Sequence, residues 1–173
     1  MISITFPDNS VKQFEKNISC LAIATNISQS LAKKCIVAMV NNTIVDLSYK
    51  IDKDSAIKFI TSDTKNEDEK KILLDTFRHS CAHLLAQAVK EIYENKVQVT
   101  IGPVIENGFY YDFKMNDSMF STEDFPKIEL KMKEIANRKL EITRLEIDKS
   151  DAIEFFKSIN ENFKCKIIEE IIK

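Results

Sequence analysis

Residues 77–88 read FRHSCAHLLAQA and contain the only two histidines of the protein, His79 and His83. Around them, apolar residues recur at steps of three and four, which is the pattern of an α-helix with one apolar face. At about 100° per residue, side chains four positions apart lie within roughly 40° of each other, so both imidazoles share one helix face. We place that face nearly opposite an apolar stripe, which consists of Leu74, Phe77, Cys81, Leu84, Leu85, Ala88 and Ile92.

Two imidazoles on one face can hold a metal ion, an acyl group or a phosphate, and a neutral imidazole can accept a proton near neutral pH. Zinc needs three or four ligands, and the helix offers no third ligand at the right spacing. His79 and His83 are therefore at most half of a metal site, and we predict no complete one within this chain. Ser80 and Cys81 do not face the histidines, because adjacent residues of a helix diverge. The alternative is a pair of solvated surface histidines.

The composition is ordinary for a soluble globular protein: 44% of the 173 residues are hydrophobic, 30% are charged, and the net charge is −2. Any contact with RNA would need a local basic patch, since the chain as a whole is not basic. Only two glycines are present, which excludes glycine-rich phosphate loops. The four scattered cysteines predict neither a zinc knuckle nor a disulfide framework and fit a reducing cytosol. No apolar run is long enough to span a membrane.

The first sixty residues read as strands, one helix and further strands, which predicts an α+β, ubiquitin-like β-grasp domain with one sheet packed on one helix. Ser19 is a predicted helix cap, and Asn41-Asn42 is a predicted turn between two strands. The predicted strands are Ile2–Phe6, Val11–Phe14, the run Cys35–Val40, Thr43–Val45 and Ala56–Thr61.

A polar, charged stretch from Ser62 to Lys71 predicts a linker, so we divide the chain into domains 1–63 and 64–173. The second domain is expected to be an α+β lobe. Its Asn107-Gly108 dipeptide predicts a hairpin turn, and Ser121 opens a helix as part of a capping box. The remaining expected elements are strands at Val97–Ile101, Phe109–Phe113 and Ile142–Ile147, a helix at Asp151–Ile159 and a strand-like tail at Phe163–Ile172.

The order of these motifs resembles the N-terminal region of the bacterial threonyl-tRNA synthetase family, over essentially the whole chain. The resemblance rests on residues 79–88, HSCAHLLAQA, and on residues 101–112, IGPVIENGFYYD. The first sixty-odd residues resemble the TGS domain of that family, with PDNS at 7–10 and VNNTIVDL at 40–47. Asn9 and Asn42 stand where the family usually has glycine, and asparagine tolerates the same left-handed backbone.

The resemblance implies that the second domain is the first part of an editing domain, which hydrolyses seryl-tRNA made in error. Such a site pairs a His-x-x-x-His element with a later Cys-x-x-x-His element, and no match to the latter occurs before Lys173. By resemblance, His79, His83 and Lys164 are assigned to catalysis, and Tyr111 and Asp112 to substrate binding.

The parent enzyme, a threonine–tRNA ligase, uses ATP, Mg²⁺ and a zinc ion of its catalytic core, none of which this chain is expected to hold. The implied partner is the tRNA for threonine, in the cytoplasm and away from membranes. The parent is expected to be a homodimer through domains that this chain lacks, and the chain itself a monomer. Two alternatives stay open: a non-enzymatic TGS adaptor that binds a partner or a regulatory RNA, and a metal-dependent deacylase completed by ligands from a second chain.

Overall fold

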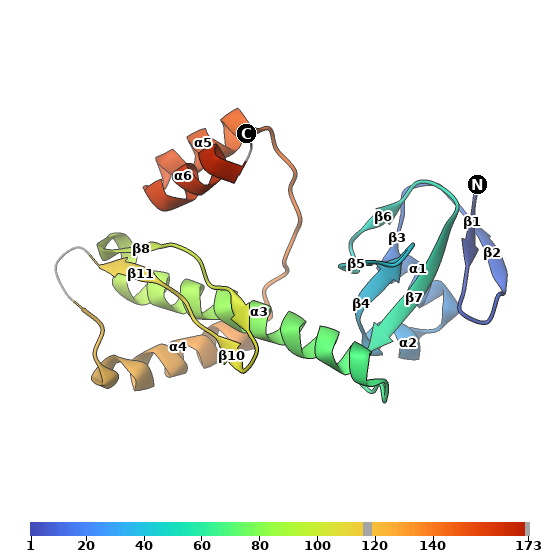
Figure 1. Ribbon diagram of the computed structural model, residues 1–173, viewed down its shortest axis with the longest axis horizontal. Helices are drawn as coiled ribbons and strands as arrows, with labels where there is room; N and C mark the ends of the chain where they lie inside the picture. The colour runs from blue at the N-terminus through green and yellow to red at the C-terminus, as the bar shows by residue number, and fades with distance from the viewer. Residues whose placement is uncertain (116–118, 172–173) are drawn as a thin grey trace. The chain divides into compact units, whose positions relative to one another are not determined.

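The computed structural model of the protein describes residues 1–115 and 119–171, which form two compact units, Met1–Leu74 and Asp75–Lys173 (Figure 1). The long helix α3 (Glu67–Tyr93) runs from the first unit into the second. The sequence-based boundary at residue 63 precedes this helix, whereas the compact units divide within it. No helix in the described part of the chain is long and apolar enough to cross a membrane.

The first unit is a mixed five-stranded sheet with strand order β2-β1-β7-β4-β5. β1 pairs with β7 in parallel and with β2 in antiparallel fashion, and β4 pairs antiparallel with both β7 and β5. This arrangement confirms the predicted β-grasp sheet. Its elements are β1 (Ile2–Thr5), β2 (Val11–Phe14), β3 (Ile18–Ser19), α1 (Cys20–Ile27), α2 (Gln29–Lys34), β4 (Cys35–Val40), β5 (Thr43–Val45), β6 (Lys50–Ile51) and β7 (Ser55–Thr61).

Apolar side chains cover both faces of this sheet, because successive residues of a strand point to opposite sides. Ile57 of β7 packs into the larger cluster, together with Ile4 of β1 and Ile23 of α1. Ile60 of the same strand packs on the other face against Leu73 of α3. The first turns of α3 therefore complete the core of the first unit.

Asparagines supply the left-handed turn positions in this glycine-poor chain. Asn41 and Asn42 have φ values of 47° and 66° and connect Val40 of β4 to its partner Thr43 of β5. Two successive positive φ values are typical of the turn that best matches the twist of a hairpin. Asn9 also has a positive φ, of 63°, so the predicted left-handed conformations of Asn9 and Asn42 are confirmed. The predicted Ser19 cap is confirmed too, since its hydroxyl accepts from the Ala22 amide.

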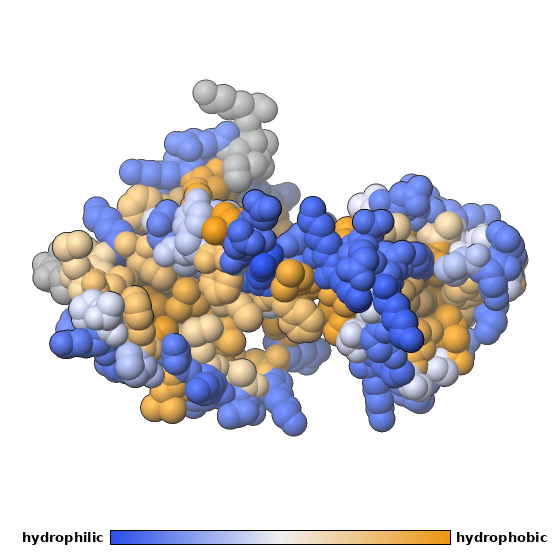
Figure 2. Space-filling model, turned by 60° about the horizontal axis from the view of Figure 1, so that its bottom comes forward, coloured by the Kyte–Doolittle hydropathy of each residue, from blue (hydrophilic) through white to orange (hydrophobic). Residues whose placement is uncertain are grey.

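The second unit packs α4 and short strands against the second half of α3 (Figure 1). Val89 of α3, Val97 of β8 and Ile128 of α4 form part of its buried core. In the view of Figure 2, hydrophobic surface is exposed on the unit that contains α4, where Phe125 and Leu130 keep more than half of their surface. Its elements after α3 are η1 (Glu94–Lys96), β8 (Val97–Val99), β9 (Val104–Ile105), β10 (Gly108–Phe109), β11 (Phe113–Met115), η2 (Thr122–Asp124), α4 (Phe125–Asn137), α5 (Lys149–Ser158) and α6 (Asn162–Ile171).

Two predicted strands of the second unit are wrong. Residues 141–148 have no regular secondary structure, and Ile142 is 94% exposed. Alternating apolar residues form a strand only where a neighbouring backbone pairs with them, and none of the described strands does so here. The predicted strand-like tail is helix α6, whose buried Cys165 lies one turn after buried Glu161, as helical spacing requires. Ile172, the last residue of that prediction, lies outside the described residues.

The predicted hairpin exists, but its turn lies one residue earlier than expected. Ile105 pairs with Gly108, so Glu106 and Asn107 form the turn. The single strand predicted at Phe109–Phe113 is interrupted, because residues 110–112 belong to no strand and β11 pairs with β8 instead. The capping box at Ser121 is confirmed: its hydroxyl accepts from the Glu123 amide.

The buried face of α3 overlaps the predicted stripe only in part: Leu84, Leu85, Ala88 and Ile92 belong to the core of the second unit, as predicted. Phe77 is 53% exposed and Cys81 is also exposed, whereas Ala82, Ala86 and Val89 are buried. Alanine contributes little to a hydrophobic pattern, but its small side chain lets neighbouring elements approach the helix closely. The histidines consequently flank the buried line of alanines at about 60–100° around the helix, and do not lie opposite the packed face.

Candidate functional site

The two histidines form a contact pair on α3. Their Nε2 atoms are 3.0 Å apart, and the rings meet edge to face with centroids separated by 4.6 Å. At this separation one ring nitrogen donates a proton and the other accepts it. The accepting imidazole must be neutral, so the pair provides a ring that can exchange a proton near neutral pH.

Lys164 of α6 belongs to the same neighbourhood. Its ammonium donates a hydrogen bond to the backbone oxygen of Thr100 over 2.8 Å. The pKa of His83 is lowered from its ordinary value of 6.5, first by partial burial of the ring and then by the charges of His79 and Lys164. His83 is therefore mostly neutral at pH 6.5 and above, with a cation nearby.

A backbone connection joins Lys164 to the predicted substrate-binding segment. The amide and hydroxyl of Thr100 both donate to the backbone oxygen of Asp112, over 3.2 and 2.6 Å. The amide of Asp112 in turn donates to the oxygen of Ile101, over 3.1 Å. These hydrogen bonds, here called the Thr100–Asp112 ladder, hold Tyr111 close to the Thr100 oxygen that Lys164 contacts. Asp112 itself is exposed.

Tyr111 lies over Gly102 and against Phe113. A Cβ atom at Gly102 would lie 2.1 Å from a Tyr111 ring carbon, so only glycine permits this approach. The ring stacks on Phe113 with centroids 4.8 Å apart. Burial raises the pKa of Tyr111, and the carboxylate of Glu161 raises it further.

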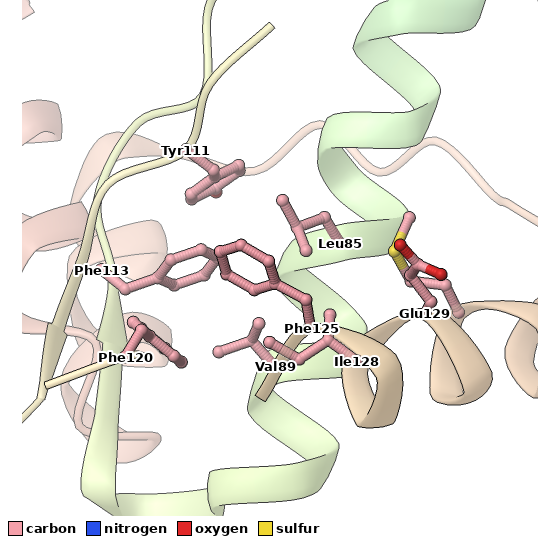
Figure 3. A pocket seen from close by; sticks show the side chains of 9 residues that line it. Leu85, Val89, Tyr111, Phe113, Phe120, Phe125, Ile128 and Glu129 are labelled. Carbon is pink, nitrogen blue, oxygen red and sulfur yellow. The ribbon is translucent and has the colours of Figure 1, made fainter. Parts of the chain in front are cut away.

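Tyr111 also lines an apolar pocket of about 340 Å³ within the second unit. Figure 3 shows the rings of Tyr111, Phe113 and Phe125 gathered beside α3, with Leu85 and Val89 of that helix facing them. A pocket of this kind suits an uncharged group of modest size. The other lining residues are Phe120, Ile128, Glu129 and Met132.

The structure thus brings His79, His83 and Lys164 together and links Tyr111 to them through the Thr100–Asp112 ladder. Of the predicted site residues, Asp112 joins this arrangement through its backbone hydrogen bonds, and its side chain is exposed. Among the described residues, no group of three His, Cys, Asp or Glu side chains could hold a metal ion. Two imidazoles alone do not satisfy zinc.

Sequence reasoning missed three residues that support this site. Glu161 is 4% exposed and pairs with Lys90 of α3 over 2.6 Å, which connects α6 to α3. Gly102 could have been noticed, because a rare glycine often marks a close approach of backbone and side chain. An ion pair between residues 71 positions apart in the sequence leaves no local pattern, so the roles of Lys90 and Glu161 became visible only in the structure.

Comparison with known proteins gives a domain family for the first unit and similar relatives along nearly the whole chain. Residues 2–61 match the TGS domain family. The chain is 48% identical over 171 residues to a threonine–tRNA ligase of Rickettsia bellii (strain OSU 85-389), and 44% identical over the same length to one of Geobacillus sp. (strain WCH70). Each match covers 99% of this chain but only 26% and 25% of the relative. The chain therefore contains a TGS domain and is similar, along nearly its whole length, to the N-terminal quarter of threonine–tRNA ligases.

Proposed function

We propose that this chain is the N-terminal part of a threonine–tRNA ligase, and that its second unit is the first part of the editing site that hydrolyses seryl-tRNA. The observation that carries the proposal is the similarity to threonine–tRNA ligases over 99% of the chain. The cluster of His79, His83 and Lys164 supports the editing role. The proposed partner is the tRNA for threonine, in the cytoplasm, and the proposed complete ligase is a homodimer.

The chemical need for editing follows from the substrates. Serine differs from threonine by one methyl group, and a binding pocket gains only about 1–3 kcal/mol from such a group. That difference gives a selectivity of roughly 10- to 200-fold, which is too small for accurate translation. A second site must therefore hydrolyse the ester bond of the wrongly charged tRNA.

In the proposed reaction, water attacks the ester carbonyl and the bond to the tRNA ribose breaks. His83 is the base that takes a proton from this water, because its lowered pKa keeps it neutral, and it returns the proton to the departing ribose oxygen. Its contact with His79 orients the ring. An ammonium has three N–H donors, so Lys164 can keep its bond to Thr100 and still stabilise the oxyanion. Tyr111 and Asp112 hold the substrate beside this group.

The proposed complete ligase uses ATP, Mg²⁺ and a zinc ion for aminoacylation. The described residues do not fit these groups: the chain has two glycines and thus no glycine-rich phosphate loop, and its histidine pair lacks a third ligand. No step of the proposed hydrolysis uses them. We place the aminoacylation chemistry in parts of the ligase that lie outside this chain.

The test compares this chain with an extended chain, in which the segment that follows the matched region in the Rickettsia bellii relative is appended after Lys173. Release of serine from seryl-tRNA for threonine is measured for both, after circular dichroism has shown that both are folded. We expect slow hydrolysis by the short chain and fast hydrolysis by the extended chain, because two imidazoles and a lysine hold the ester incompletely.

Substitutions in the extended chain then assign the activity. His79→Ala and His83→Ala should each abolish most of it, whereas Gln87→Ala, an exposed polar position one turn further along α3, should leave it unchanged. Equal inactivity of both folded chains would contradict the editing proposal and favour a non-enzymatic TGS adaptor. Full activity of the short chain would show that the described residues already complete the site.

A further inference from the structure

Among the ion pairs of the described residues, the one with the most buried carboxylate joins α3, which carries His83, to the residue just before α6, which carries Lys164. Lys90 of α3 contacts Glu161, at the start of α6, over 2.6 Å, and the Glu161 side chain is only 5% exposed. The other carboxylate oxygen, Oε2, is buried without a hydrogen-bond partner. Lys90 also donates to the backbone oxygen of Val97 over 3.3 Å. The lysine thus fixes Glu161 to both α3 and the first residue of β8.

The positions of this pair match those of the proposed catalytic groups. Lys90 follows His83 by seven residues, about two helical turns, so both side chains leave α3 within roughly 20° of each other. Glu161 precedes Lys164 by three residues at the beginning of α6. The Lys90–Glu161 ion pair therefore connects α3, which carries His83, to the beginning of α6, which carries Lys164.

A stabilising role alone explains this pair poorly. Burying the Glu161 carboxylate costs several kcal/mol of hydration, whereas Lys90 keeps 33% of its side chain exposed. Well-packed apolar residues often stabilise a protein as much or more. Here one carboxylate oxygen also lacks a hydrogen bond, which adds to the cost. What the pair does provide is a defined distance and direction between two helices, because a charge in a low-dielectric site has one strongly favoured position.

We propose that Glu161, held by Lys90, is a positioning residue that sets the ammonium of Lys164 beside His83. Its catalytic consequence rests on the proposed editing function, whereas the geometric claim does not. Without the bridge, α6 can rotate or shift on α3, and the Lys164 bond to Thr100 is no longer enforced. A displacement of about 1 Å can lower a rate on the order of 100-fold.

The test measures the position of Lys164 through the titration of His83, followed by NMR of its ring nitrogens in the 173-residue chain. Lys164→Met gives the reference for complete loss of the lysine charge, and the pKa of His83 should rise. Glu161→Ala and the milder Glu161→Gln should also raise it, toward the value found with Lys164→Met. The matched control is Glu91→Ala, which breaks the exposed α3–α4 pair with Arg138 and should not change the pKa.

The direction of the change separates positioning from a direct charge effect. Removing the negative charge of Glu161 would by itself favour the neutral imidazole and lower the pKa of His83. Greater exposure of the ring would also raise the pKa, because burial is the first cause of its lowering. A rise in Glu161→Gln that disappears when Lys164→Met is also present therefore reports displacement of Lys164, whereas a rise that persists in the double variant reports lost burial and contradicts the proposal. An unchanged or lower pKa in folded Glu161→Gln would overturn the proposal, and so would a pKa that does not respond to Lys164→Met.

Kinetics of the extended chain complete the test. Glu161→Gln should lower kcat about 10- to 100-fold and leave KM nearly unchanged, because a catalytic group is misplaced while the substrate contacts remain. A raised pKa of His83 together with no hydrolysis by any chain would refute the editing function and leave the positioning claim intact. Hydrolysis that is insensitive to Glu161→Gln, with an unchanged pKa, would refute the positioning claim alone.

Discussion

The two units of this protein are held together in different ways. The first closes one five-stranded sheet between two apolar clusters, and Ile4 and Ile60 are fully buried in them. The described part of the second has only two-stranded sheets, and large apolar side chains such as Ile142 and Leu145 are 94% and 79% exposed. The first unit relies on apolar burial and strand pairing to a greater degree than the second.

Polar contacts take over part of this role in the second unit. Arg138 of α4 makes a two-bond contact with Glu91 of α3, over 2.9 and 2.8 Å. Arg78 donates to the backbone oxygen of Glu106 over 2.9 Å and so fixes the β9–β10 turn to α3. Contacts of this kind set directions between elements but contribute little net free energy when exposed. The candidate site therefore lies in the unit whose helices and strands are positioned by a few specific polar contacts.

The largest expected effect is in the first unit. Ile4→Ala should lower its free energy of unfolding by about 2–5 kcal/mol, because a fully buried side chain leaves a cavity. Urea unfolding followed by amide NMR signals resolves both units. The second unit should change by much less, and Val11→Ala, at an exposed position of β2, should have a small effect. Equal losses in both units would contradict the idea of two separate cores.

A smaller effect is expected in the second unit from Gly102→Ala. The added methyl group overlaps the Tyr111 ring, which must move, at a cost of about 1–3 kcal/mol. NMR shifts of the Tyr111 and Phe113 rings should change, while signals of the first unit stay in place. The control is Ile101→Ala, at a neighbouring exposed position. Unchanged ring signals in Gly102→Ala would show that Tyr111 is not fixed over residue 102.

The smallest expected effect concerns pH. Because the pKa of His83 is lowered in the folded chain, the unfolded chain binds a proton more readily. The stability contributed by neutral His83 is present above pH 6.5 and is lost as the pH falls through the lowered pKa. Unfolding midpoints between about pH 7.5 and pH 5 should therefore decrease less in His83→Gln than in the unmodified chain. A steeper decrease in His83→Gln would contradict the direction of the shift.

Local signals in the sequence were enough for the five strands of the main sheet and for helix α1 of the first unit, but they did not predict α2, β3 or β6. The Ser19 hydroxyl accepts a hydrogen bond from the Ala22 amide, and Asn41 and Asn42 form a two-residue turn. Both were predictable because caps and turns depend mainly on neighbouring residues. The alternation of β7 likewise corresponds to its two packed faces. In the histidine helix the spacing correctly placed both imidazoles together, as their 3.0 Å separation shows.

The second unit shows where such signals end. Residues 142–147 contain apolar and β-branched residues that favour a strand, but pairing depends on a distant partner that no local pattern reveals. The residues of α6 include β-branched isoleucines that favour a strand, yet burial of Cys165 selects a helix. The proximity of Lys164 to His83 was available only through resemblance to a family. The support from Lys90 and Glu161 was not available from the sequence at all.

One rate decides whether His83 and Lys164 act together on seryl-tRNA. Release of serine from seryl-tRNA for threonine is measured for the extended chain and for its Lys164→Met variant under single-turnover conditions. Loss of an oxyanion-stabilising group should lower this rate on the order of 100- to 1,000-fold, with folding unchanged by circular dichroism. An unchanged rate in the folded Lys164→Met variant would contradict the claim.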